Sequence, residues 1–447
     1  HFFTEKIAHS SYMLIGQKVC AVIDPQRDVD HYIEEARVQG VKITHILQTH
    51  LHADFISGHM DLAEKTGAHI YIAESADCTF NHVPLSEGDV VELEDMKLLV
   101  LETPGHTPEH LSYVVVDTSR SDRPVGVFVG DTLFVGDVGR PDLFPNMAQE
   151  LADKLYHSLH EKLMKLPDYC EVYPAHGAGS LCGRSVGAKW RSTIGYERNC
   201  NQTLQITNKA AFIASLTENM PPAPDHFRRC SDINRRGPVQ VKDLPQLEEL
   251  QPMEFLEKSG EADAIVLDTR SYLAFGGQHI SGAWHLDFNG NFPTFAGWVL
   301  PTDKKIYLVA EDYKKAQDAV IWARRTGVDN IVGYLEGGMT SWAVTGFQSG
   351  SVYQMSAEDL HQWTTGDEEF ILLDVRATQE YKENHIAGSV NIPVADLRAR
   401  YRELDPFKTT VLICSSGNRS SLGTSILKQH GFKDLINLVG GMTGYST

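Results

Sequence analysis

The spacing of apolar and polar residues divides the N-terminal half of the chain into short strands that alternate with helices. Short apolar runs predict strands, and apolar residues three or four positions apart predict helices. The predicted strands are 21–23, 43–47, 98–101, 125–129 and 170–173, and the predicted helices are 30–39, 56–66 and 147–166. Such alternation is typical of an α/β protein.

The second half contains an internal repeat. Asp-Thr-Arg at 268–270 recurs as Asp-Val-Arg at 374–376. His-Ile-Ser-Gly-Ala at 279–283 recurs as His-Ile-Ala-Gly-Ser at 385–389, and Gly-Gly-Met at 337–339 recurs at 440–442. The offsets are 106, 106 and 103 residues, in the same order along the chain. Three ordered matches predict two copies of one domain of about a hundred residues. Each copy is expected to form a parallel sheet with helices on both faces.

Proline and glycine mark the main domain boundary. Pro221, Pro222 and Pro224, followed by Arg-Arg-Gly-Pro at 235–238, interrupt regular structure. A chain of 447 residues is also too long for a single core. We predict three domains: 1–237, which includes a C-terminal extension, 238–350 and 351–447.

Charge and cysteine content narrow the choice of partners. The net charge of −19 argues against nucleic acid, because phosphate binding needs a basic surface. No stretch is apolar over the 18 residues or more that a membrane span needs. The seven cysteines are odd in number and irregularly spaced, which favours reduced thiols. We therefore expect a cytoplasmic protein with no nucleic-acid or membrane partner.

Possible metal ligands follow four of the predicted strands. They are His50, His52 and Asp54 after 43–47, His106 after 98–101, Asp131 after 125–129, and His176 after 170–173. If these strands share one sheet and one direction, their ends meet at one edge, where catalytic loops usually lie. We interpret His59 and His110, which lie close by, as structural.

The ligand types bear on the identity of the metal. His50, His106 and Asp131 would form a facial triad that suits non-haem Fe(II) and leaves positions open for dioxygen and substrate. Zinc hydrolases instead favour a tetrahedral, nitrogen-rich site that holds one activated water. In the iron interpretation, His52, Asp54 and His176 would orient the ligands and the substrate.

Phe55 bears on the number of metal ions. Residues 50–54 (His-Leu-His-Ala-Asp) resemble the metal loop of the metallo-β-lactamase superfamily, whose hydrolases usually carry a second His directly after the Asp. A phenyl ring cannot ligate a metal. Phe55 at that place therefore favours a single metal ion over two-metal hydrolysis.

Residues 2–196 resemble the persulfide dioxygenase branch of this superfamily. The matching segments are 50–54, 104–107 (Pro-Gly-His-Thr), 130–133 (Gly-Asp-Thr-Leu) and 139–142 (Gly-Arg-Pro-Asp). The resemblance implies an αββα sandwich, one Fe(II) per chain on His50, His106 and Asp131, and oxidation of a persulfide by O₂ to sulfite. It also suggests a homo-oligomer. Arg140 matches an Arg that family members place near the substrate; the alternative is a structural salt bridge.

The thiol that carries the persulfide stays open. Several glutathione-using members have His-Asp-Tyr where this chain has His-Gly-Ala at 176–178. The Tyr that would help to position substrate is therefore absent. Cys182 and Cys200 could hold a persulfide or act as small buried apolar residues, and we favour the second interpretation.

Cys414 begins a second chemical motif. It follows the apolar run 410–413 and opens the loop 414–420 (Cys-Ser-Ser-Gly-Asn-Arg-Ser), which leads into a predicted helix. A helix N-terminus and the guanidinium of Arg419 both stabilise a thiolate. The same loop would hold the terminal sulfur of a cysteine persulfide, through Ser415, Ser416, Gly417, Asn418 and Ser420.

Loop length distinguishes sulfur transfer from phosphate chemistry. Four residues separate Cys414 from Arg419, whereas cysteine phosphatases have five. The shorter loop, together with 374–376, 385–388 and 440–442, resembles rhodanese sulfurtransferases. The earlier copy has no cysteine at the equivalent place, between 308 and 311, so we expect an inactive rhodanese-like domain followed by a catalytic one.

Together the motifs predict an enzyme of sulfide detoxification. A low-molecular-weight thiol persulfide would be oxidised by O₂ to sulfite, and Cys414 would pass a sulfane sulfur to sulfite to give thiosulfate. Two alternatives stay open. One is a zinc-dependent thioester hydrolase of the glyoxalase II type, and the other is a sulfur carrier whose metal site is catalytically idle.

Overall fold

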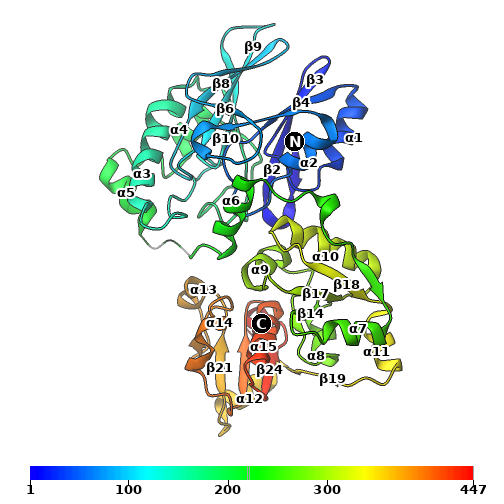
Figure 1. The fold of residues 1–447 in the computed structure, drawn as a ribbon. Coiled ribbons are helices and arrows are strands. Elements are labelled where there is room, and N and C mark those ends of the chain that lie inside the picture. Colours follow the sequence, from blue (N-terminus) through cyan, green and yellow to red (C-terminus); the bar gives the residue numbers. More distant parts are fainter. Residues whose placement is uncertain (219, 221, 446–447) are drawn as a thin grey trace. The chain divides into compact units, whose positions relative to one another are not determined.

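The computed structural model describes residues 1–218, 220 and 222–445, which fold into two compact units (Figure 1). The first unit comprises His1–Asp243 with Arg325–Gly327, and the second comprises Leu244–Arg324 and Val328–Thr447. Pro221 and the last two residues of the third predicted domain lie outside the described residues. The boundaries expected after residues 237 and 350 stay predictions.

Two six-stranded sheets form the centre of the first unit. The first has the order β1 (Phe2–Thr4), β2 (His9–Ile15), β3 (Val19–Ile23), β4 (Lys42–Leu47), β5 (His69–Ala73) and β6 (Val83–Leu85). The second has the order β12 (Ser192–Thr193), β11 (Glu171–Pro174), β10 (Pro124–Gly130), β9 (Leu111–Asp117), β8 (Met96–Glu102) and β7 (Val90–Leu93). Both sheets contain parallel and antiparallel pairs.

Alternate residues of each strand face different apolar cores, as the two-residue period of a strand requires. In β3, Ala21 and Ile23 pack between the two sheets, whereas Cys20 and Val22 face a core with the helices. Those helices are α1 (Asp30–Gln39) and α2 (His59–Thr66). On the outer face of the second sheet lie α3 (Ala148–His157), α4 (Ile194–Cys200) and α5 (Lys209–Thr217). The layers are therefore helix, sheet, sheet and helix, which confirms the αββα sandwich.

The strands that precede the predicted ligands belong to two sheets, so the condition of one shared sheet is not met. The segment 43–47 belongs to β4 of the first sheet, whereas 98–101, 125–129 and 170–173 belong to β8, β10 and β11 of the second. A sandwich has two sheets whose edges meet, and apolar pattern alone does not assign a strand to either. The predicted helix 147–166 is confirmed as a helical segment: α3 ends at His157 and continues without a break as a π-helical turn, Ser158–Lys162, and a 3-10 turn, Leu163–Lys165.

The second unit contains two five-stranded parallel sheets of identical topology. One has the order β13 (Glu248–Leu250), β18 (Ile331–Leu335), β17 (Lys305–Val309), β14 (Ala264–Asp268) and β16 (Trp284–His285). The other has the order β20 (Tyr353–Met355), β24 (Leu435–Leu438), β23 (Thr410–Ile413), β21 (Ile371–Asp374) and β22 (Val390–Asn391). A short pair, β15 (His279–Ile280) and β19 (Ser349–Gly350), lies apart from them. The matching order confirms the duplication.

The helices of the second unit also follow the duplication. The earlier copy has α7 (Pro252–Ser259), α8 (Tyr272–Gly277), α9 (Phe292–Val299), α10 (Tyr313–Arg325) and α11 (Gly338–Val344). The later copy has α12 (Ala357–Thr365), α13 (Thr378–Glu383), α14 (Leu397–Arg400), α15 (Asn418–Gln429) and α16 (Gly441–Tyr445). Within the described part of the chain, every helix is too short or too polar to span a lipid bilayer.

Most of the repeated motifs have structural roles. In each copy the Arg of the Asp-x-Arg motif pairs with the Asp at the strand end, at 2.6 Å for Arg270–Asp268 and 2.7 Å for Arg376–Asp374. The repeated His bonds through Nδ1 to the carbonyl oxygen four residues earlier, at 2.7 Å for His279 and 2.9 Å for His385. These interactions hold the loops after the first long strand of each copy.

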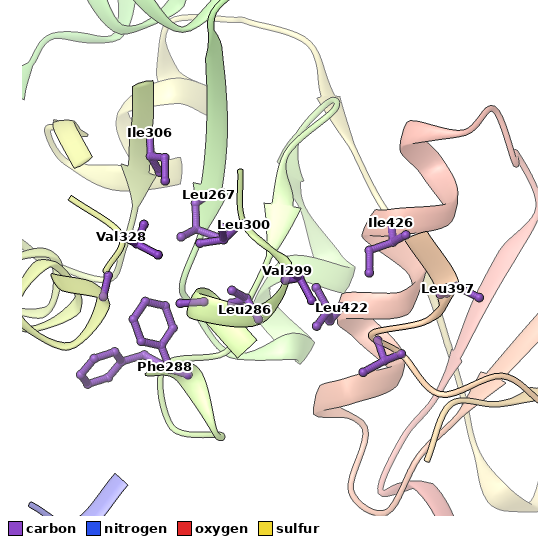
Figure 2. Packing of buried hydrophobic residues seen from close by; sticks show 14 of the residues in the cluster. Leu267, Leu286, Phe288, Val299, Leu300, Ile306, Val328, Leu397, Leu422 and Ile426 are labelled. Carbon is purple, nitrogen blue, oxygen red and sulfur yellow. The ribbon is translucent and has the colours of Figure 1, made fainter. Parts of the chain in front are cut away.

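The two copies share one apolar core. Leu286, Val299 and Leu300 of the earlier copy belong to one buried cluster with Leu422 and Ile426 of the later copy, and Figure 2 shows Val299 beside Leu422. All five side chains are at most 4% exposed. Burial of apolar surface on this scale stabilises the pair as one unit.

Candidate metal centre and sulfur-transfer site

Three predicted ligands meet at the ends of the sandwich strands. Asp131 Oδ2 lies 3.3 Å from His106 Nε2 and 3.7 Å from His50 Nε2. The three side chains are fully buried, and none of these three atoms has a hydrogen-bond partner in the described part of the chain. Unpartnered buried polar atoms are costly unless something binds them. Two imidazoles and a carboxylate at these separations suit a divalent cation.

Hydrogen bonds fix the orientation of both imidazoles. Thr49 Oγ1 donates to Asp24 Oδ2, so it accepts from His50 Nδ1 at 2.9 Å. His106 Nδ1 donates to the carbonyl oxygen of Arg140 at 2.9 Å. Burial lowers the pKa of both imidazoles, which are therefore neutral. Each Nε2 lone pair then points at the shared space, as expected of a metal-bound His.

The three residues expected to orient the ligands lie directly behind them. His176 Nδ1 donates to Asp131 Oδ1 at 2.7 Å, and His176 Nε2 lies 2.8 Å from Asp54 Oδ2. His52 Nε2 lies 3.1 Å from Asp24 Oδ1. Burial would raise the pKa of Asp131, but the charge and hydrogen bond of His176 hold it well below its usual range. Asp131 is therefore a carboxylate.

Phe55 is buried beside this site. It packs against His9, a residue that the sequence analysis did not predict here. The Phe55 ring lies 4.1 Å from the ring of His9 and 4.4 Å from that of His52, centroid to centroid. His9, at the start of β2, is fully buried and lies 5.6 Å from the His176 ring. Burial lowers the pKa of His9, and neither of its ring nitrogens has a hydrogen-bond partner among the described residues.

A second group of potential ligands adjoins the first. One ligand atom each of Asp54, His176 and Cys182 lies within 4.8 Å of the others. Cys182 is fully buried, and burial raises the pKa of its thiol well above the usual value. A neutral thiol beside the site agrees with a small apolar residue, although its place next to Asp54 and His176 also allows a ligand role.

Arg140 is buried and its guanidinium is held by protein groups. Nε and one terminal nitrogen donate to the Asp142 carboxylate at 2.7 and 2.8 Å, and the other terminal nitrogen donates to the carbonyl oxygen of Leu181 at 3.2 Å. This geometry corresponds to the structural alternative for Arg140. Its carbonyl also holds His106, so the residue supports the ligand shell through its backbone.

Helix α6 (His226–Arg236) forms hydrogen bonds with the backbone of residues 51–55, in the candidate metal loop. Asn234 is buried, and its amide nitrogen donates to the carbonyl oxygens of His52 at 2.8 Å and Phe55 at 2.9 Å. Ser231 Oγ donates to the carbonyl oxygen of Leu51 at 3.3 Å. The predicted C-terminal extension is thus part of the support of the site. A polar residue in a later helix gives no sequence signal for such a role.

The sulfur-transfer loop places Cys414 directly after β23 and before α15. The backbone N–H of Gly417 donates to Cys414 Sγ at 3.1 Å, and Ser420 Oγ donates at 3.4 Å. Gly417 has φ of +102°, a conformation that side chains rarely adopt. Gly441 has no room for a side chain, because a Cβ there would lie 2.2 Å from the carbonyl oxygen of Cys414. The Gly-Gly-Met motif therefore supports the back of the loop.

Arg419 is held by a residue that the sequence did not predict. Its two terminal nitrogens donate to the Glu380 carboxylate at 2.6 and 2.7 Å, and one also donates to Ser415 Oγ at 2.6 Å. Burial would raise the pKa of Glu380, but the hydrogen bonds and charge of Arg419 lower it to about 2. The guanidinium is thus fixed beside the loop, with Ser415 between it and the backbone.

The earlier copy forms one wall of a cavity at this loop. The cavity has a volume of about 390 Å³, and Asp287, Asn291 and Phe295 face Ser416, Asn418 and Arg419 across it. Tyr272 also packs at the loop, where a Cβ on Gly417 would lie 2.8 Å from the Tyr272 ring. Sheet register places Ala310 where the later copy has Cys414, because Val309 pairs with Asp268 as Ile413 pairs with Asp374.

Family profiles match both halves of the chain. That of the metallo-beta-lactamase superfamily matches residues 5–176, and that of the rhodanese-like domain matches residues 251–345 and 356–447.

Three relatives illustrate the range of similarity. The mitochondrial persulfide dioxygenase of Mus musculus is 29% identical over 242 residues, which cover 54% of this chain and 88% of that protein. A hydroxyacylglutathione hydrolase of Hydrogenovibrio crunogenus is 35% identical over 159 residues, which cover 35% of this chain and 52% of the hydrolase. The crystal structure of a metallo-beta-lactamase from Staphylococcus aureus is 35% identical, with a TM-score of 0.68, and the match covers 75% of this chain and 97% of that one.

Fold, motifs and relatives agree with the expected fusion. The chain belongs to the metallo-beta-lactamase superfamily, with persulfide dioxygenases among its relatives, and carries two rhodanese-like domains after the metal-binding fold.

Proposed function

We propose that the protein is an enzyme of sulfur metabolism that oxidises a low-molecular-weight thiol persulfide with O₂ and transfers sulfane sulfur through Cys414. The observation that carries the proposal is the buried group of His50, His106 and Asp131, whose three inward-facing atoms have no partner among the described residues. The similarity to a persulfide dioxygenase supports the same conclusion.

The first reaction converts the persulfide RSSH, O₂ and water into RSH and sulfurous acid, which ionises to sulfite. Ferrous iron held by the three ligands would supply open positions for O₂ and for the persulfide sulfur. His176 holds Asp131 as a carboxylate, and Thr49 and the Arg140 carbonyl hold the two imidazoles. Phe55, which packs against the rings of His9 and His52, would offer no ligand to a second metal ion.

The second reaction uses the thiolate of Cys414. It attacks the sulfane sulfur of a second RSSH, releases RS⁻ and becomes a persulfide. Sulfite then takes the outer sulfur, which gives thiosulfate and restores the thiol. Gly417 N–H and Ser420 Oγ–H lie where they would stabilise negative charge on the sulfur. Dioxygenation thus produces the acceptor that sulfur transfer consumes.

Replacement of one cysteine tests the order of these steps. Cys414→Ser is expected to keep the wild-type rate of O₂ uptake with a thiol persulfide, to lose thiosulfate formation and to accumulate sulfite. Oxygen uptake, sulfite and thiosulfate are measured on the same sample, together with its iron content. Cys200 is exposed, so its interpretation as a small buried residue is wrong. It also lies outside the loop, so Cys200→Ser is the matched control. Thiosulfate formation by Cys414→Ser at the wild-type rate would contradict the proposal.

A second candidate function is thioester hydrolysis with zinc. The group Asp54, His176 and Cys182 could complete a two-metal site, and a hydroxyacylglutathione hydrolase is among the relatives. Phe55 argues against it, because it removes the ligand expected at that place. Two zinc ions per chain in anaerobically purified protein, with no O₂ uptake on addition of persulfides, would favour the hydrolase.

A further inference from the structure

A small cavity of about 220 Å³ lies beside the metal loop of the first unit. Its polar lining comes from one stripe of α6, namely Arg228, Ser231, Asp232 and Arg235, and it reaches the metal loop at Ala53. Residues 228, 231, 232 and 235 are three, four and seven positions apart, so their side chains lie on one helix face. Phe227 contributes an apolar wall.

The position of this cavity relative to the metal ligands is fixed. Asn234 and Ser231 bind carbonyl oxygens of the loop that carries His50 and His52. Phe227 and Ala53 share an apolar cluster with Cys182. Cys182 Sγ is in turn within 4.8 Å of ligand atoms of Asp54 and His176. A molecule in the cavity is therefore close to the space where substrate sulfur would react.

Two arginines of the cavity are available to a ligand. Neither Arg228 nor Arg235 forms an ion pair within the part of the chain that the structure describes, although the chain carries a net charge of −19. Arg235 Nε is buried and has no hydrogen-bond partner among the described residues. A buried guanidinium donor without a partner is unfavourable. The carboxyl group of the buried Glu109 lies nearby and accepts the N–H of Leu51 at 3.0 Å, and burial raises its pKa.

We propose that this cavity binds the anionic part of the thiol that carries the persulfide, through Arg228 and Arg235. The inference rests on the proposed function, because it assigns the carrier of that reaction to a chemical class. A guanidinium binds carboxylate or phosphate with two parallel hydrogen bonds. Glutathione offers carboxylates and coenzyme A offers phosphates. The cavity thus takes over the positioning role for which the chain lacks a Tyr after His176.

Binding of the unreactive thiols tests the site without turnover. Glutathione and coenzyme A are titrated separately into the full chain by calorimetry, for the wild type, Arg228→Gln, Arg235→Gln and the double variant. We expect one of the two thiols to bind the wild type, and its Kd to rise at least tenfold in the double variant. Arg120→Gln serves as control, because Arg120 is exposed and distant in sequence from α6. The thiol that responds identifies carboxylate or phosphate as the recognised group.

Two results would overturn the inference. The first is equal affinity of the wild type and the double variant for both thiols, with thermal unfolding unchanged. The second is a wild type that binds neither thiol. A variant with lower thermal stability but unchanged Kd would assign Arg235 only to the support of Glu109, which also overturns it.

Oxygen uptake separates this inference from the proposed function. With the uncharged persulfide of 2-mercaptoethanol, the double variant is expected to take up O₂ with the KM and kcat of the wild type. With the anionic persulfide, its KM is expected to rise at least tenfold, while its kcat stays within twofold of the wild type. If the wild type takes up O₂ and the variants behave alike, the cavity assignment fails and the function stands. If the variants lose thiol affinity while the wild type takes up no O₂, the cavity assignment stands and the proposed function fails.

Discussion

Phe55 occupies a fully buried position between the imidazoles of His9 and His52. We infer that it stands in the place of a ligand for a second metal ion. Whereas Phe55 is apolar, Glu380 is charged, and its carboxylate holds the guanidinium of Arg419 beside the loop that begins with Cys414. We expect these two residues to shape the chemistry of the two candidate sites.

Phe55→His is expected to raise the metal content from one ion to two per chain. The new imidazole would join Asp54 and His176 at the second group of ligands. Metal analysis after reconstitution with zinc measures the effect. Phe55→Leu keeps the position apolar and is expected to retain one ion. A wild type that already binds two ions would contradict the role assigned to Phe55.

Glu380→Gln tests the ion pair with Arg419 through its pH dependence. The pKa of Glu380 in the folded chain is about 2, below its ordinary value of 4.5, so the pair stabilises the fold fully above pH 4.5 and loses its effect as the pH falls toward 2. Because the carboxylate is 35% exposed, we expect a contribution of only about 0.5–1 kcal/mol at pH 7.

Urea unfolding of wild type and Glu380→Gln at pH 7, 5 and 3.5 measures this difference. The difference in the free energy of unfolding between the two proteins should be the same at pH 7 and pH 5, and smaller at pH 3.5. Glu369→Gln, at an exposed position of the same copy, provides the control. A difference that does not change down to pH 3.5 would assign the effect of the substitution to packing.

At the scale of elements, strand ends and motif spacing allowed much of the molecule to be predicted. Apolar runs followed by His or Asp located the segments that carry His50, His106 and Asp131, because a buried strand leaves its polar residues at its end. The repeated motifs predicted two sheets of one topology, and the structure confirms them. The structure also brings together the three predicted ligands.

Other features could not be predicted because they depend on contacts between distant segments. His9, Asn234 and Glu380 lie far in sequence from the groups they contact, and a lone His, Asn or Glu carries no motif. The assignment of β4 to a different sheet from β8, β10 and β11 is of the same kind. Periodicity gives the face of a strand but not its partner.

Helix α8 carries Tyr272 of the earlier copy to the sulfur-transfer loop of the later one. Tyr272→Ala is expected to lower thiosulfate formation about tenfold and to leave O₂ uptake unchanged, because the loop loses a packing partner at Gly417. Steady-state rates of both reactions on one preparation provide the measurement. Tyr353→Ala changes an exposed Tyr and should affect neither. Equal thiosulfate formation in wild type and Tyr272→Ala would show that the earlier copy does not contribute to transfer.

At the scale of the whole molecule, the two candidate sites lie in separate units of one chain. The predicted metal ligands all belong to the first unit, and Cys414, Arg419 and Glu380 all belong to the second. The proposed intermediate that links them, sulfite, is small and highly soluble. Transfer between the units therefore requires no covalent link between the sites.

Mixing two variants tests this independence. His106→Ala would abolish dioxygenation, and Cys414→Ser would abolish transfer, so neither alone should form thiosulfate. A mixture of the two is expected to recover it, with a lag that shortens as protein concentration rises. Thiosulfate is followed over time, with each variant alone as the control. No recovery at any concentration would mean that sulfur passes only within one chain.

The apolar core shared by the two rhodanese-like copies constrains how this chain can change in evolution. The earlier copy has Ala310 where the later copy has Cys414, yet its Leu286, Val299 and Leu300 share one buried cluster with Leu422 and Ile426 of the later copy. Deletion of the earlier copy would expose the apolar side chains of Leu422 and Ile426 to water and would remove one wall of the cavity at the loop that begins with Cys414. We therefore expect the earlier copy to be retained as the packing partner of the later one.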